Sequence, residues 1–217
     1  LATNASDDGA TQQTFTIATG SFVNGNNTIA VEIHQSAANS SDISFDMALS
    51  GNPITSSTTL IPFNSSWKYL DKGTNQGTAW RAAGFNDATW LSGNAQLGYG
   101  DGDEATTVSY GTNASNKYIT TYFRKAISVP DISQFTGYTL SLKRDDGAVV
   151  YLNGTEIFRT NMPTGTISYT TRATAAASDD GNTAQVKTLT TSQIIQGTNT
   201  IAVEIHQNVN TSSDCSF

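Results

Sequence analysis

Cysteine is almost absent from this chain of 217 residues, because Cys215 is the only one. A single thiol excludes a disulfide framework and a cysteine-based metal cluster. Charged residues make up only 13% of the chain, and the formal net charge is -7. An acidic balance of this kind disfavours nucleic acid and anionic membrane surfaces as partners. No apolar run approaches the roughly 20 residues that a membrane-spanning helix needs, so membrane insertion is not expected.

Helical periodicity is also nearly absent, and alternation of apolar and polar residues takes its place. The stretches TIAVEIHQ (28–35), SFDMALS (44–50) and YTLSLKR (138–144) each put their apolar residues on one side of an extended chain. AVVYLNG (148–154) ends in Asn-Gly, which favours the tight turn of a β-hairpin. These patterns predict an all-β fold, an antiparallel β-sandwich of the jelly-roll type.

An internal repeat is the strongest signal in the sequence. When the chain is shifted by 172 residues, 24 of the 45 overlapping positions are identical without a gap. NTIAVEIHQ occurs at 27–35 and again at 199–207. A unit of 172 residues has the size of a whole domain, so the sequence predicts a tandem-repeat unit that is seen out of phase.

The repeat divides the chain into three parts. Residues 1–52 are predicted to be the C-terminal strands of a preceding jelly-roll repeat, and the Ser/Thr-rich stretch 53–63 a linker. Residues 64–217 are predicted to form a jelly roll that lacks its last strand. The 1–50 segment should then complete a neighbouring sandwich, either in the preceding domain of one long polypeptide or in an adjacent subunit. The inward-facing residues that would carry this assembly are Ile29, Val31, Ile33, Phe45, Met47 and Leu49.

Four stretches suggest a family, and they are WRAAGFNDATW (80–90), YFRKAISVP (122–130), RDDGAVVYLNGTEI (144–157) and GTNTIAVEIHQ (197–207). In order and spacing they resemble the galactose-binding-like jelly-roll superfamily. They are similar to the sugar-binding domain of family 2 glycoside hydrolases and to repeat domains of secreted bacterial proteins. The resemblance implies the fold, but the superfamily serves many functions. Jelly rolls of this superfamily often carry a structural calcium ion, so the resemblance also implies calcium as a candidate ligand here.

The loop GYGDGDEATT (98–107) holds the candidate metal ligands. Asp101, Asp103 and Glu104 bring three carboxylates together among glycines, and calcium prefers oxygen ligands of this kind. The alternative is a solvated acidic turn. Tyr99 and Tyr110 flank the loop and are candidate contacts for a sugar ring, although aromatic residues in such folds more often fill the core.

No catalytic apparatus is expected. Glu204 and His206 share a face of one strand, but no third residue is placed to complete a nucleophile or a metal site. A polar outer face with a cross-strand ion pair explains them more simply. Cys215 occupies the position of Ile43 in the first copy, which favours a core residue over a reactive thiol.

Two functions remain open. The first is a structural or adhesive unit of an extracellular, cell-surface array or filament, whose partners are other copies of itself or neighbouring repeats. The second is a calcium-stabilised carbohydrate-binding module attached to a secreted hydrolase, with glycans as partners. If the host glycosylates secreted proteins, the acceptor sites would be Asn4, Asn26, Asn39, Asn64, Asn113, Asn153 and Asn210.

Overall fold

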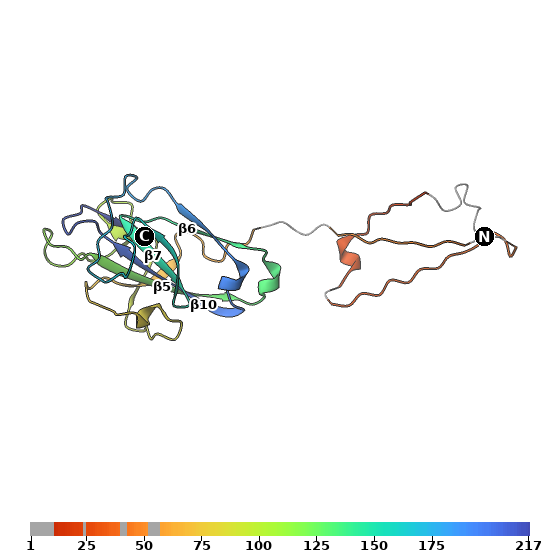
Figure 1. The fold of residues 1–217 in the computed structure, drawn as a ribbon, viewed down its shortest axis with the longest axis horizontal. Helices are drawn as coiled ribbons and strands as arrows, with labels where there is room; N and C mark the ends of the chain where they lie inside the picture. The colour runs from red at the N-terminus through yellow and green to blue at the C-terminus, as the bar shows by residue number, and fades with distance from the viewer. Residues whose placement is uncertain (1–10, 24, 40–42, 52–56) are drawn as a thin grey trace. The chain divides into compact units, whose positions relative to one another are not determined.

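A computed structural model describes residues 11–23, 25–39, 43–51 and 57–217. The chain divides into two compact units, residues 1–57 and residues 58–217 (Figure 1). No helix among the described residues is both long enough and apolar enough to cross a bilayer.

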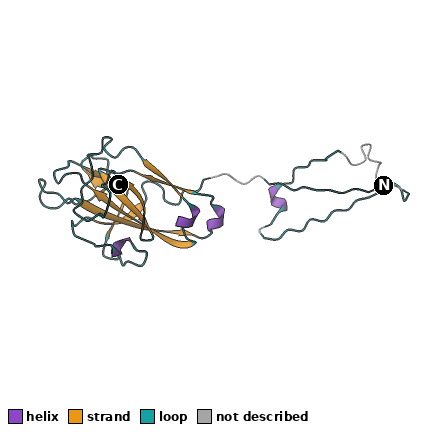
Figure 2. Cartoon of the chain, in the orientation of Figure 1, coloured by secondary structure: helices purple, strands orange, loops and turns teal. Residues whose placement is uncertain are grey.

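The larger unit contains all the β-strands found in the described residues (Figure 2). Short 3-10 turns connect some of them, namely η2 (Ala79–Arg81), η3 (Ile132–Gln134) and η4 (Thr191–Gln193). The strands are β1 (Ser66–Leu70), β2 (Leu91–Asn94), β3 (Leu97–Tyr99), β4 (Thr106–Thr107), β5 (Thr120–Val129), β6 (Tyr138–Leu142), β7 (Gly147–Leu152), β8 (Thr155–Thr160), β9 (Gln185–Leu189), β10 (Gly197–His206) and β11 (Cys215–Ser216).

Six strands form the main sheet in the order β2-β1-β5-β10-β7-β8, with every neighbouring pair antiparallel. The facing layer is built from β11-β3-β4 and from the pair β6-β9. Ser216 of β11 also forms an isolated antiparallel bridge with Asp145, which lies between β6 and β7. The expected β-sandwich is therefore confirmed.

The main hydrophobic core lies between the two layers. Its buried side chains come from the main sheet, among them Phe123, Val150 and Val203, and from the facing layer, among them Leu97 and Leu142. A second buried cluster covers the other side of the main sheet, where Trp80, Trp90 and Tyr122 pack against Val149 and Ala202 of its central strands. The central strands of the main sheet thus bury both faces.

Several strand predictions are confirmed by the structure. YTLSLKR contains β6, which ends at Leu142. The hairpin of β7 and β8 turns at Asn153 and Gly154, whose positive φ values of 52° and 91° are those of a tight hairpin turn. Leu60 and Ile61, which the sequence assigns to the linker, pack against the main core.

The smaller unit contains no strand among its described residues, although two strands are expected there. It keeps one 3-10 turn, η1 (Thr19–Ser21), which lies 172 residues before η4. The Asn27 side chain accepts from the Val23 amide at 3.0 Å and donates to the Val23 carbonyl at 2.8 Å. Asn199 makes the same two bonds to Ile195, at 3.0 and 2.7 Å. The local geometry before β10 therefore recurs at the same repeat spacing.

The apolar side chains of this smaller unit are exposed. The six predicted assembly residues are each between 46% and 57% exposed, and they are Ile29, Val31, Ile33, Phe45, Met47 and Leu49. Within the smaller unit, these six side chains are therefore not buried.

Candidate functional site

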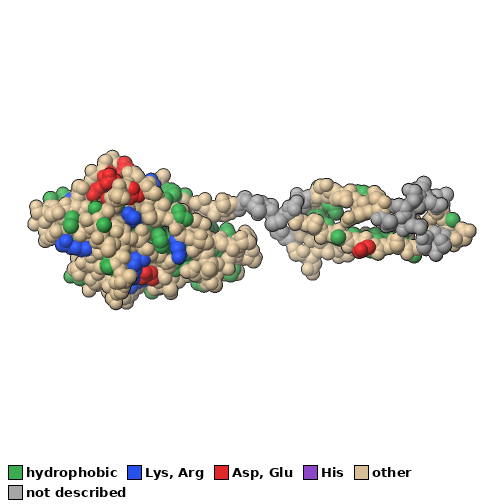
Figure 3. Space-filling view, turned by 45° about the horizontal axis from the view of Figure 1, so that its top comes forward, with side chains coloured by type: hydrophobic (Ala, Val, Ile, Leu, Met, Phe, Trp, Pro, Cys, Tyr) green, Lys and Arg blue, Asp and Glu red, His purple; other side chains and the backbone are tan. Residues whose placement is uncertain are grey.

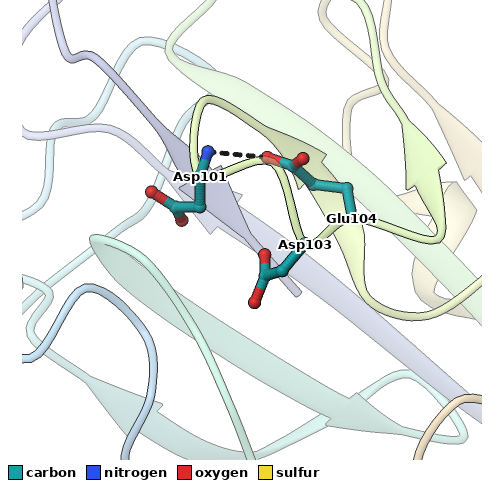
Figure 4. Close-up of side chains that lie close together, drawn as sticks. All are labelled: Asp101, Asp103 and Glu104. Atoms are coloured by element: carbon teal, nitrogen blue, oxygen red, sulfur yellow. Dashed lines mark hydrogen bonds between the residues drawn. The ribbon is translucent and has the colours of Figure 1, made fainter.

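The acidic loop connects β3 to β4. Gly100 and Gly102 turn it with φ values of +115° and +80°. A Cβ atom at Gly100 would lie 2.7 Å from the carbonyl oxygen of Ser213, so the close approach of that backbone also requires glycine. The backbone amide of Asp101 donates to the Glu104 carboxylate at 3.0 Å (Figure 4). The Gly102 amide donates to the same carboxylate, also at 3.0 Å.

The loop gathers negative charge. One carboxylate oxygen from each of Asp101, Asp103 and Glu104 lies within 4.8 Å of the others. Asp101 and Asp103 are exposed and Glu104 is partly buried. Partial burial raises the pKa of Asp101, and the charges of Asp214 and of its two loop neighbours raise it further. Figure 3 shows acidic side chains gathered in one patch on this unit. The arrangement suits a hard cation that takes oxygen ligands, and calcium itself stays a prediction.

A buried pair of carboxylates lies near this loop. Asp145 and Asp146 are both 2% exposed. Asp146 accepts hydrogen bonds from the amides of Ala177 and Asn208, each at 2.8 Å. Burial raises the pKa of Asp145 to about 8, and the proximity of Asp146 and Asp214 adds to the shift. The sequence pattern does not reveal this buried pair, because nothing in it shows that the backbone segments at 177 and 208 meet there.

The two tyrosines that flank the acidic loop face each other. The rings of Tyr99 and Tyr110 meet edge to face, with centroids 5.1 Å apart. The Lys117 ammonium lies 4.9 Å from both centroids. Tyr99 is buried and its hydroxyl has no hydrogen-bond partner, so its ring offers no open surface for a sugar. Tyr110 is partly buried, and its contact with a ligand stays a prediction.

Glu204 and His206 are buried, although an exposed outer face is expected for them. Glu204 accepts from the Tyr151 hydroxyl at 2.6 Å and from the Arg81 guanidinium at 3.3 Å. His206 Nδ1 lies 2.7 Å from the Thr171 carbonyl, and His206 Nε2 lies 3.3 Å from Glu204. The expected polar surface is wrong, because the segments that hold Arg81 and Thr171 cover this side of β10. The two residues belong to a buried network of hydrogen bonds.

Arg124 is a second buried charge that the sequence patterns do not reveal. Its Nε donates to Asp87 at 2.8 Å, and Nη1 donates to the carbonyls of Trp80 and Ala82. Three bonds from one guanidinium therefore fix the loop between β1 and β2 on the main sheet. The aromatic residues of WRAAGFNDATW are held by this contact and fill the second core.

A polar groove of about 380 Å³ lies beside β9. Its walls include Arg144, Asn161, Asp179 and Gln185. The Arg144 guanidinium lies 3.8 Å from the Asp179 carboxylate. No aromatic residue lines the groove, so a ligand there would be held by hydrogen bonds.

The predicted acceptor asparagines differ in their surroundings. Asn26, Asn39, Asn64 and Asn113 are exposed, and Asn210 is partly buried. The Asn153 amide is already used, because it donates to Asn199 and accepts from the Thr200 amide. Asn4 lies outside the described residues. Cys215 is buried in the main core, as its exchange with isoleucine predicts.

Comparisons with known proteins give structural neighbours only. No family model matches this chain, and no curated protein matches it. A β-glycosidase from Bacteroides vulgatus matches 67% of this chain and 17% of its own length, with 19% identity and a TM-score of 0.45. A β-glucuronidase from Bacteroides uniformis matches 67% of this chain and 14% of its own, with 21% identity and a TM-score of 0.46.

A third neighbour is a β-glucuronidase from Bifidobacterium dentium, which matches 67% of this chain and 19% of its own, with 16% identity and a TM-score of 0.42. Another of these enzymes is described as a member of glycoside hydrolase family 2, the family that the sequence motifs resemble. The chain spans about a fifth or less of each enzyme. At these levels of similarity no activity, ligand or metal passes from the enzymes to this chain.

Proposed function

We propose that this chain is a non-catalytic unit of an extracellular structural or adhesive array, in which strands of one repeat complete the sandwich of another. The supporting observation is a contrast between two copies of one sequence. Ile201, Val203 and Ile205 of β10 are 7%, 2% and 0% exposed. Their equivalents in the smaller unit, 172 residues earlier, are Ile29, Val31 and Ile33, and these are 49%, 47% and 46% exposed.

The same contrast continues past β10. Phe217 is 8% exposed and Cys215 is 2% exposed, whereas the equivalent Phe45 and Ile43 are 57% and 63% exposed. Burying an apolar side chain of this size contributes about 1.5–3 kcal/mol, so five of them contribute on the order of 10 kcal/mol. That amount is comparable to the whole stability of a domain. The segment therefore has a strong tendency to enter a sandwich that supplies the other strands.

Two arrangements meet this requirement. The first strands of a preceding repeat in one longer polypeptide would bury the segment, and so would an adjacent subunit. Repeated head to tail, a contact of this kind joins unlike surfaces, and it stays open where the rotation between copies does not close a ring. A filament or a surface array follows from both.

We propose a unit without catalysis because the candidate catalytic residues are inaccessible. The Glu204–His206 pair is buried beneath loops and bonded to Tyr151, Arg81 and Thr171. Substrate would have to displace these loops before it met either residue. We therefore expect no hydrolysis of glycosides, esters or phosphates by the full chain.

Calorimetry of an extended chain tests the proposal. Residues 58–172 are placed directly before residue 1, which supplies the strands that the first copy lacks. Because unfolding enthalpy scales with the number of residues that fold, it should rise about twofold over that of the 217-residue chain.

Val31→Asp in the extended chain is the control, since a charge at this buried position should return the enthalpy to the value of one domain. An extension that leaves the enthalpy unchanged, with residues 58–172 unfolded, would contradict the proposal.

The second candidate is a calcium-stabilised carbohydrate-binding module of a secreted hydrolase. The polar groove beside β9 favours it, because Arg144, Asp179 and Gln185 present the kinds of donors and acceptors that sugar hydroxyls use. A glycan-array screen of the full chain tests this candidate. Glycan binding that is lost in Gln185→Trp, which fills the groove, would support carbohydrate binding. An array on which the chain binds no glycan would reject it.

A further inference from the structure

The edge of β6 that faces away from β9 has no strand partner among the described residues. Tyr138 and Leu140 of this strand are partly buried and pack against the main core, and Leu142 is buried. Thr139 and Ser141 face outward and are exposed. The free edge therefore presents backbone groups beside an apolar inner face, which is where another strand would add.

An isolated bridge at Asp145, three residues past the end of β6, supplies a register for such a strand. The Asp145 amide donates to the Ser216 carbonyl at 3.1 Å, and the Ser216 amide donates to the Asp145 carbonyl at 3.4 Å. This is an antiparallel pair that exchanges both hydrogen bonds. A strand that runs along β6 in the direction of β11 is antiparallel to β6. Its successive residues therefore pair with β6 residues of decreasing number.

The repeat provides a sequence for that strand. Phe45 is equivalent to Phe217, and DMALS (46–50) follows it. In the register of the bridge, Met47 lies opposite Leu142 and Leu49 lies opposite Leu140. Both pairs belong to the inner face, because partners in an antiparallel pair point to the same side of the sheet.

The outer face matches as well. Asp46 lies opposite Lys143 in this register, which gives an opposite-charge pair across the strands. Ala48 lies opposite the exposed Ser141. A shift by one residue would turn Met47 and Leu49 outward, so apolar burial and charge select the same register.

We propose that the free edge of β6 binds the segment Asp46–Ser50 of a second copy of this chain as an antiparallel strand, with Ala48 opposite Ser141. The inference rests on the proposed function and names the contact between successive copies. The donor segment and the acceptor edge lie on different parts of the chain, so each copy can give one strand and take another. Because the contact joins unlike surfaces, it can repeat from copy to copy, and it gives an open filament where the rotation between copies does not close a ring.

Cross-linking between two singly substituted full-length chains tests the contact. One chain carries Ala48→Cys and the other Ser141→Cys, and both positions are exposed. Cys215 is buried and does not compete. Directly opposed residues of a hydrogen-bonded pair lie about 5.5 Å apart between Cα atoms, which is within reach of a disulfide. We expect oxidation of the mixture to give a dimer in which peptide mass mapping finds residue 48 joined to residue 141.

The matched control pairs Ser50→Cys with Ser141→Cys, which lie two residues out of register and beyond disulfide reach. Lys143→Glu in the acceptor should lower the yield of the dimer joined at 48 and 141, and Asp46→Lys in the donor should restore it. Thermal unfolding of each single variant shows that its fold is retained. Equal yields from the two cysteine pairs, or no dimer joined at 48 and 141, would overturn the contact.

The outcomes of the cross-linking test and of the calorimetric test are independent of one another. The enthalpy of the extended chain depends on residues 27–45, whereas the cross-link depends only on Asp46–Ser50 and β6. Loss of the cross-link with a doubled enthalpy rejects this edge and keeps the proposed function. An unchanged enthalpy rejects the proposed function, whatever the cross-link shows.

Discussion

The carboxyl group of Asp145 is surrounded by protein and by other acids. It is 2% exposed, its Oδ1 has no hydrogen-bond partner, and its charge is opposed by Asp146 and Asp214. The pKa of Asp145 is therefore raised to about 8 in the folded protein, from an ordinary value of 3.8. The folded state keeps this proton at a pH where the unfolded chain has released it.

We predict that Asp145→Asn stabilises the protein at high pH. With a raised folded pKa, the stabilising contribution of Asp145 is complete below pH 4 and is lost as the pH rises from about 4 to about 8. Asparagine does not titrate, so the variant should gain on the order of 2 kcal/mol over the natural chain at pH 8, and little at pH 4. Thermal unfolding at both pH values measures this. If Asp145→Asn loses equal stability at pH 4 and at pH 8, the prediction is wrong and the Asp145 carboxyl group itself stabilises the fold.

The acidic loop is the second residue-scale feature with a testable consequence. If Asp101, Asp103 and Glu104 bind calcium, the ion at 100 times its dissociation constant adds about 2.7 kcal/mol. We predict that chelation lowers the melting temperature and that Glu104→Gln abolishes the calcium dependence. Asp131→Asn is the control, because Asp131 is an acid at the N-terminus of η3, outside the loop. A melting curve that chelation leaves unchanged would reject the site.

At the scale of elements, the sequence predicts the strands of the larger unit well and their surroundings poorly. The alternation in TIAVEIHQ and the Asn-Gly turn predict β10 and the hairpin of β7 and β8, because these signals are local. The burial of Glu204 and His206 is not predictable in this way. Their partners come from Arg81, Tyr151 and Thr171, up to 123 residues away in sequence. Covering loops carry no periodic pattern that would place them over a given strand.

The acidic loop shows the same difference between local signals, which the sequence predicts, and long-range contacts, which it does not. Three carboxylates within four residues are visible as a cluster, and the structure brings them within 4.8 Å. The approach of Asp214 and of the buried Asp145–Asp146 pair depends on the bridge between Asp145 and Ser216 of β11. Tyr99 is misjudged as a ligand contact for a similar reason, since the sequence does not show that Tyr110 and Lys117 pack on its ring.

The edge of β6 leads to a prediction for the element itself. Appending DMALSG after Phe217 should place a strand along β6 in the register derived from the bridge. The two added apolar side chains become buried, so the melting temperature should rise by several degrees, because 1 kcal/mol shifts it by about 2–4 °C in a domain of this size. The same extension with aspartate in place of its methionine and leucine is the control. Equal effects of both extensions would mean that no strand forms.

At the scale of the whole molecule, one sequence occurs in two environments. In the larger unit it forms β10 and β11 and fills the core between the sheets. In the smaller unit the same turn, asparagine bonds and positive-φ glycine precede it, but its apolar side chains are exposed. Local sequence thus produces the local turn in both copies, whereas strand formation requires partners from elsewhere in a sandwich.

Hydrogen exchange at Ile29–Ile33 tests this account most directly. In the dilute 217-residue chain, these amides should exchange without protection. In the chain extended by residues 58–172, they should become as protected as the amides of Ile201–Ile205, because both copies then lie at the centre of a sheet. The account predicts that change on extension. Rapid exchange at Ile29–Ile33 in both chains would contradict it, and so would full protection in the dilute 217-residue chain.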